Sequence, residues 1–184
     1  MKIQKLRVLE RRRLHAGHAY WFEELAIQHP DGIVRPKPMV RHPGAACVIP
    51  VIDTDSGPEI VMVRNERVTI ESMLLEVPAG GIDPDESPAD AAARELEEES
   101  GYRAATIDPL CRFYTTPGLT DELMHVFVAR ELTHVGQRLE VYESLTVHRF
   151  SAAELLDMVE RGDLIDGKTV LALLMAERRG VFGE

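Results

Sequence analysis

The stretch GGIDPDESPADAAARELEEESGY, residues 80–102, decides the organisation of the chain. It opens with two glycines and an Asp-Pro-Asp tripeptide, residue types that favour turns. Ser87 then supplies an N-cap hydroxyl, Pro88 suits the first helical position, and Asp90 stands where a capping box has an acid. The alanines, leucine and glutamates that follow are good helix formers, and Gly101 is a typical stop. The stretch therefore predicts a turn followed by a helix of about three turns.

Three glutamates of this helix are expected to share one face. At about 100° per residue, Glu95, Glu98 and Glu99 fall within an arc of about 100°, beside an apolar stripe of alanine and leucine. A solvated acidic face is the plain alternative. Against it, like charges three and four residues apart repel each other, and the C-terminal half of a helix disfavours anions. A divalent cation would relieve both effects, and clustered carboxylates suit Mg²⁺ or Mn²⁺.

The spacing within the stretch resembles a known motif. Every fixed position of the Nudix box, G-x5-E-x7-R-E-U-x-E-E-x-G-U with U aliphatic, is matched between Gly80 and Gly101, with Glu86 as the first acid. The single departure is Tyr102, an aromatic residue at the last aliphatic position, which affects packing and not chemistry. The chain thus resembles a Nudix hydrolase, an enzyme that uses divalent metal to split a nucleoside diphosphate linked to another group.

The resemblance implies roles for the residues of the box. Metal binding, by about two or three ions, would fall to three carboxylates and one backbone carbonyl: Glu95, Glu98, Glu99 and Ala79. Arg94 would orient the glutamates, and Glu86 would be a supporting acid of the loop. Gly80, at the head of the box, would lie at the substrate.

Residues outside the box resemble one subfamily, the ADP-ribose pyrophosphatases. Pro117 lies sixteen residues after Gly101 and opens the pattern Pro-Gly-x-Thr-x-Glu, which ends at Glu122. The segment Leu-Glu-Val-Pro-Ala-Gly at the start of the box fits the same subfamily, although an ordinary turn would also explain Pro-Gly. Arg64 and Arg67 resemble the arginines that these enzymes place before a loop above the substrate. Surface salt bridges are the alternative for both.

A polar loop before the last predicted strand supplies further acids. Family members carry glutamates in this loop, here residues 136–145, that bind a metal or act as the base for water. Glu143 matches the metal-binding position, whereas the position of the base is taken by Val141, one residue from Glu140. Either glutamate could be the base, and an exposed loop without a catalytic role is the alternative.

The composition limits partners and location. The 184 residues include 31 acidic and 21 basic side chains, and the formal net charge is −10. This charge argues against nucleic acid or an anionic membrane surface as a partner. The N-terminus lacks the apolar run of a signal peptide, and no apolar stretch reaches the ~20 residues of a membrane-spanning helix. We expect a cytoplasmic protein, with Cys47 as a buried thiol.

An antiparallel β unit is expected over residues 1–44. Residues 3–14 and 18–28 favour two strands joined around Gly17, and the extended segment 33–42 carries prolines that favour an edge position. A unit of this size is too small to bury its own faces, so it must pack on something.

Residues 45–184 show the pattern of a compact α/β domain. The continuous apolar run 45–53 predicts a strand covered on both faces, 59–64 is its hairpin partner, and 65–72 is a polar loop. Strands are expected at 74–78, 102–114 (one or two, interrupted at Asp108-Pro109), 122–132 and 145–150. Helices are expected from Ser151 to Arg161 and over 166–179. This order of mixed strands and helices resembles the Nudix α/β/α sandwich.

The N-terminal unit holds Tyr20, Trp21 and Phe22 in a row. An exposed cluster of this kind usually marks an interface. The resemblance implies a homodimer in which this unit crosses to the partner subunit, with Trp21 or Phe22 in or near the adenine site. The alternative is that these aromatics seal the unit onto its own domain.

The resemblance implies metal-dependent hydrolysis of ADP-ribose to AMP and ribose 5-phosphate. Another nucleoside diphosphate sugar is the alternative substrate, since nothing in the sequence reads the base directly. A non-catalytic Nudix nucleotide-binding module is a second alternative, but such modules usually lose box glutamates, and none is lost here. A purely structural protein with an acidic helix is the third.

Overall fold

The computed structural model describes residues 5–17, 20–139, 141 and 144–183. The chain forms two compact units. Unit 1 comprises Met1–Gly44 and Tyr114–Leu123, and unit 2 comprises Ala45–Phe113 and Met124–Glu184. Unit 1 therefore contains a segment that lies far from the N-terminus in the sequence.

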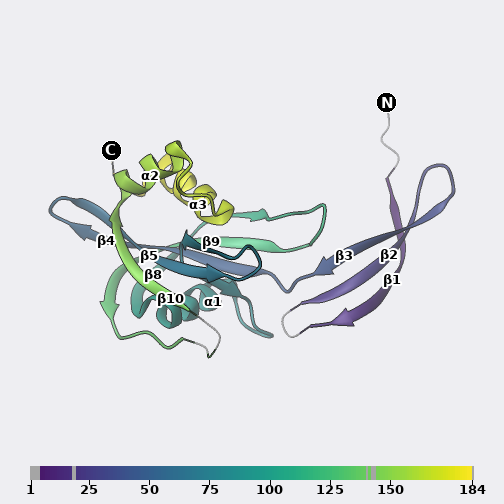
Figure 1. The fold of residues 1–184 in the computed structure, drawn as a ribbon, viewed down its shortest axis with the longest axis horizontal. Coiled ribbons are helices and arrows are strands. Elements are labelled where there is room, and N and C mark those ends of the chain that lie inside the picture. Colours follow the sequence, from purple (N-terminus) through teal and green to yellow (C-terminus); the bar gives the residue numbers. More distant parts are fainter. Residues whose placement is uncertain (1–4, 18–19, 140, 142–143, 184) are drawn as a thin grey trace. The chain divides into compact units, whose positions relative to one another are not determined.

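Unit 1 is built on a three-stranded antiparallel sheet with the order β1-β2-β3 (Figure 1). Its strands are β1 (Arg7–Ala16), β2 (Trp21–Gln28) and β3 (Val34–Arg41). Its small core contains Leu25, Ile27 and Met39. β1 is exposed along its whole length, whereas alternate residues of β2 are buried. The proline-containing strand β3 lies at an edge of this sheet, as predicted.

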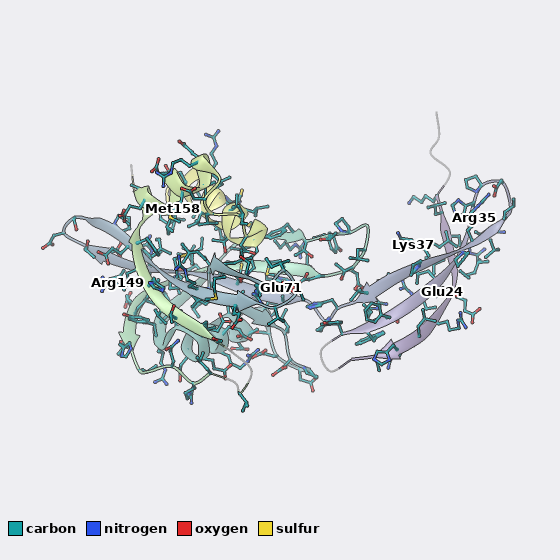
Figure 2. The ribbon with its side chains drawn as sticks, viewed as in Figure 1. Glu24, Arg35, Lys37, Glu71, Arg149 and Met158 are labelled. Atoms are coloured by element: carbon teal, nitrogen blue, oxygen red, sulfur yellow. The ribbon has the colours of Figure 1, made fainter. Side chains whose placement is uncertain are left out.

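The second segment of unit 1 attaches along β3. Val40 donates its N–H to the carbonyl of Leu119 at 2.9 Å and forms a parallel bridge with Thr120. Lys37, labelled in Figure 2, donates from Nζ to the Gly118 carbonyl at 2.9 Å. The Pro-Gly-x-Thr-x-Glu segment is thus held by the N-terminal sheet.

Unit 2 is organised around a mixed seven-stranded sheet with the order β10-β5-β4-β9-β8, to which β6 and β7 add by pairing with β5 and β4. β4 and β9 are parallel, and the other registered pairs are antiparallel. The strands are β4 (Ala45–Thr54), β5 (Gly57–Arg67), β6 (Ser72–Glu76), β7 (Ala79–Gly81), β8 (Tyr102–Tyr114), β9 (Leu123–His134) and β10 (Leu145–Ser151).

Helices cover both faces of this sheet (Figure 1). They are α1 (Pro88–Glu95), continued by the π-helical segment η1 (Leu96–Ser100), and then α2 (Ala152–Arg161) and α3 (Gly167–Arg178). One core joins the sheet to α2 and α3, and the other joins it to α1. The predicted α/β/α sandwich is confirmed. None of the helices in the described residues combines the length and apolar character needed to cross a membrane.

β4 shows why the central strand is apolar throughout. Cys47, Ile49 and Val51 face the core with α2 and α3, whereas Ala46 and Val48 face the core with α1. Successive side chains of a strand point to opposite faces, so a strand covered on both sides has no polar position. Cys47 is fully buried, as predicted, and burial raises the pKa of its thiol to about 12.

Three local predictions were wrong. The expected polar loop 65–72 is only a turn over 68–71, because β5 continues to Arg67 and pairs there with Ser72, the first residue of β6. The glycines that favour a turn at the head of the box form β7 against β4. β8 is not interrupted at Asp108-Pro109, since this strand lies at an edge of the sheet, where proline is tolerated. Tertiary pairing outweighs local propensity at each place.

Candidate active site

The box helix starts as its sequence predicts. Ser87 is the N-cap and accepts the N–H of Asp90 at 3.2 Å, with Pro88 in the first turn. The predicted three turns of α-helix are only partly correct, because the segment Leu96–Ser100 has the wider π-helical pattern. Single π-helical turns are rare and occur frequently at functional sites. This one carries Glu98 and Glu99.

Arg94 connects the acids of the box. Its guanidinium donates to Glu86 at 2.9 and 3.0 Å, to Glu95 at 2.6 Å and to Glu98 at 3.2 Å, and also to the Gly81 carbonyl at 2.9 Å. The bonds to Glu86 contribute most to raising the pKa of Arg94 and, in turn, hold the pKa of the Glu86 carboxyl below its usual value. Three carboxylates share one guanidinium, so this cluster keeps an excess of negative charge.

The turn before the helix lies directly against two of the glutamates. A Cβ added to Gly80 would lie 2.0 Å from Oε1 of Glu95, so only glycine leaves room for that carboxylate. The N–H of Ala79 donates to Oε2 of Glu99 at 2.9 Å. Glu95 and Glu99 are only 8% and 4% exposed, which rules out the solvated acidic face for these two side chains.

The carboxyl end of the helix is closed by residues 135–138, which follow β9 and are called here the capping segment. Their backbone N–H groups donate to the carbonyls of Glu98 at 3.0 Å and Gly101 at 2.8 and 3.1 Å, and the Gln137 amide donates to the Glu99 carbonyl at 2.6 Å. These carbonyls would otherwise be unpaired at the helix end. The donors also offset the partial negative charge beside the glutamates.

Gly101 is needed at this junction for two reasons. It has a left-handed φ of +73°, and a Cβ there would lie 2.8 Å from backbone atoms of both Gly136 and Gln137. The last glycine of the box is therefore fixed by its own conformation and by the capping segment that packs on it.

The donor set fits a divalent cation. All candidate ligands are oxygens, two of the carboxylates are buried, and the cluster carries excess negative charge. Among the described residues, no three His, Cys, Asp or Glu side chains are already arranged to hold a metal ion. Glu95 and Glu98 bond to Arg94, and Glu99 bonds to Ala79. The predicted loop acids Glu140 and Glu143 lie outside the described residues.

The two predicted arginines of β5 differ in their surroundings. Arg64 is exposed, whereas Arg67 donates from Nε and Nη2 to Glu76 at 2.7 and 2.5 Å. Sequence reasoning missed Glu76, which is 1% exposed and also forms an ion pair with Lys168 of α3. Its signal was a single charge in an otherwise apolar segment before the box.

The remaining predicted residues lie in unit 1. Pro117 and Glu122 belong to the segment held by β3, and Glu122 accepts the Thr115 hydroxyl at 2.6 Å. Trp21 donates its indole N–H to Glu23 at 2.8 Å. Phe22 is 46% exposed.

Comparison with known proteins decides the family. The family model described as NUDIX domain matches residues 41–172. The chain belongs to the Nudix family. This Nudix protein is 34% identical to an ADP-ribose pyrophosphatase of Bacillus subtilis, over 94% of this chain and 93% of the relative. It is 32% identical to an ADP-ribose pyrophosphatase of Mycobacterium tuberculosis, over 88% of this chain and 78% of the relative.

A solved structure supports the architecture. The crystal structure of an ADP compounds hydrolase aligns with a TM-score of 0.83 at 24% identity, covering 98% of this Nudix protein and 97% of that chain. At that identity the likeness shows the fold alone. Together, these matches confirm the resemblance to the Nudix hydrolases and the predicted Nudix fold.

Proposed function

We propose that this Nudix protein is a metal-dependent pyrophosphohydrolase that converts ADP-ribose to AMP and ribose 5-phosphate. The observation that carries the proposal is the complete acidic cluster around Arg94, with Gly80 and Ala79 fitted against Glu95 and Glu99. The names of the two relatives, which match along most of the chain, support ADP-ribose as substrate. Another nucleoside diphosphate sugar is the alternative substrate.

Nudix hydrolases generally require divalent metal ions. About two or three Mg²⁺ or Mn²⁺ ions would supply positive charge that neutralises the diphosphate and would make water easier to deprotonate. The residues that would hold them are Glu95, Glu98, Glu99, Glu143 and the Ala79 carbonyl.

The chain's own residues supply orientation and proton transfer. Arg94 fixes the glutamates, and Arg64 and Arg67 bind the anionic diphosphate. Glu140 or Glu143 takes a proton from the attacking water. The attack of this water on one phosphorus breaks the bond from that phosphorus to the oxygen between the two phosphates. Two phosphate monoesters leave, one on each sugar.

The proposed enzyme is a cytoplasmic homodimer in which the β1–β3 sheet of one subunit packs on the other. Support comes from β1, which is exposed along its whole length and carries the apolar residues Val8, Leu9 and Leu14. Trp21 or Phe22 then lies in or near the adenine site. A guanidinium, that of Arg13, covers one face of Trp21 at 4.5 Å from the ring centroid.

A substrate panel tests the reaction. ADP-ribose, other nucleoside diphosphate sugars, dinucleoside polyphosphates and NADH are compared for release of phosphate monoesters, with and without EDTA. We expect ADP-ribose to give the highest kcat/KM, EDTA to abolish turnover, and Mg²⁺ or Mn²⁺ to restore it. If another sugar nucleotide is turned over faster, that compound and not ADP-ribose would be assigned as the substrate.

Two substitutions test the metal assignment. Glu98→Gln removes a charged ligand and should lower kcat by about 100-fold or more. Glu97→Gln is the matched control, because Glu97 lies in the same helical turn but pairs with Arg103 and Arg138 instead of Arg94. Equal turnover in both variants would contradict the assignment.

A further inference from the structure

The side chain of Arg67 contacts Glu76, which lies further along the hairpin of β5 and β6 and not directly opposite Arg67. Arg67 pairs with Ser72 near the end of this hairpin, where Figure 2 labels Glu71 in the connecting loop. Glu76 pairs with Val63, four residues back along β5. The side chain of Arg67 must therefore extend back along the hairpin to reach the Glu76 carboxylate.

The contact between Arg67 and Glu76 is bidentate. Nε and Nη2 of Arg67 bond to separate oxygens of Glu76, which fixes the plane and the direction of the guanidinium. Nη1 is the nitrogen that Glu76 does not engage. The Arg67 side chain is 41% exposed, whereas that of Glu76 is 1% exposed. A buried acid thus holds one edge of a cation that is itself only partly buried, and the edge that Glu76 does not engage is called here the outward edge.

A buried ion network of this kind is not required for stability alone. Burying charges costs solvation energy, and apolar residues of similar volume often serve as well or better. Lys168 is the second cation on Glu76, and it also bonds to Asp166 at 3.0 Å. Asp166 accepts the N–H and hydroxyl of Thr169, whose Oγ1 accepts the N–H of Val77 at 3.0 Å.

The network is continuous in sequence with the candidate active site. Val77 follows Glu76, and Ala79, two residues further on, donates its N–H to Glu99. The negative charge of Glu99 lies close enough to Arg67 to contribute to raising its pKa, after the larger effect of Glu76. Arg67 is therefore within electrostatic reach of one acid of the box, Glu99.

We infer that Glu76 is a positioning residue: it holds Arg67 so that the outward edge of the guanidinium meets the diphosphate anion beside the box glutamates. Lys168 then neutralises Glu76 from the α3 side and anchors the helix, without directing Arg67. The inference rests on the proposed function, because the anion is the diphosphate of the substrate.

A double-mutant cycle tests this division of roles on the panel substrate that the wild type turns over fastest. Arg67→Ala and Glu76→Gln should each lower kcat/KM by about 10- to 100-fold. The double variant should lose no more than either single variant, since Glu76 acts through Arg67. Multiplied losses would overturn the inference.

Two further variants separate positioning from folding. Lys168→Met should lower the thermal stability and keep kcat/KM within about 3-fold of wild type, because it leaves the bidentate contact between Arg67 and Glu76 in place. Arg67→Lys keeps the positive charge but cannot form the bidentate contact with Glu76, so this variant should lose activity like Arg67→Ala. Loss of activity in Lys168→Met equal to that in Glu76→Gln, or full activity in Arg67→Lys, would overturn the inference.

A measurement without turnover keeps the inference testable if ADP-ribose is not the substrate. The Nε–H of Arg67, assigned in the NMR spectrum by its loss in Arg67→Lys, should be protected from solvent exchange in the wild type and in Lys168→Met. It should lose protection in Glu76→Gln. Unchanged protection would show that Glu76 does not hold Arg67, whatever the substrate.

Discussion

Replacing Gly101 by alanine tests the capping segment at the end of the box helix. The left-handed φ of +73° at Gly101 costs an alanine about 1–2 kcal/mol. The added Cβ would also lie 2.8 Å from backbone atoms of Gly136 and Gln137, and forcing a methyl group into packed structure costs about 1–3 kcal/mol more. We therefore expect the free energy of unfolding to fall by about 2–5 kcal/mol.

Gly162→Ala is the matched control. Gly162 ends α2 with nearly the same φ, +75°, but an added Cβ would meet nothing within 4 Å. This variant should lose only the conformational cost of about 1–2 kcal/mol. Urea unfolding followed by circular dichroism gives both free energies, and the difference between them is the cost of displacing the capping segment. Equal losses would refute the reasoning.

The same pair of variants should differ in activity. The capping segment bonds to the carbonyls of Glu98 and Glu99, so displacing it in Gly101→Ala should move these glutamates and lower kcat. Gly162→Ala should retain wild-type kcat.

Three further predictions concern the loop acids, the assembly and pH. Glu143→Gln should lower kcat more than Glu140→Gln if Glu143 binds metal, and wild-type kinetics in both would remove the loop from the mechanism. Light scattering should give about twice the 20.6 kDa chain mass, and Leu9→Glu should give a monomer; a monomeric wild type at micromolar concentration would end the proposal. Arg94 lowers the pKa of Glu86, so the stabilisation from this pair is present above pH 4.5 and is lost as pH falls through the lowered pKa. Glu86→Gln should therefore be less stable than wild type at pH 7, with a difference that shrinks in acid; a constant difference would contradict this.

Features with a local cause could be predicted from the sequence. Ser87 and Ser151 cap the helices that follow them, as predicted, because the cap, the first-turn acid and the helix formers are neighbours in the chain. The continuous apolar run of β4 likewise predicted a strand covered on both faces, because the apolar residues are neighbours in the chain. The box spacing identified the family because its fixed positions all fall within the single segment from Gly80 to Gly101.

Features that depend on distant partners could not be predicted. Glu76 and Lys168 are 92 residues apart, and neither position alone indicates an ion pair. The packing of Gly136 on Gly101 and the pairing of β7 with β4 likewise depend on the finished sheet. The π-helical turn has no marker in the sequence, since its residues are ordinary helix formers.

The composition of unit 1 has a consequence for how this architecture can change. Because Tyr114–Leu123 is inserted between β8 and β9 of the larger unit, the chain passes between the units three times. Removing the first 44 residues would leave Leu119 and Thr120 without the strand that binds them. The N-terminal sheet is therefore not a detachable extension: gain, loss or exchange of this unit between relatives requires a matching change in the β8–β9 connection.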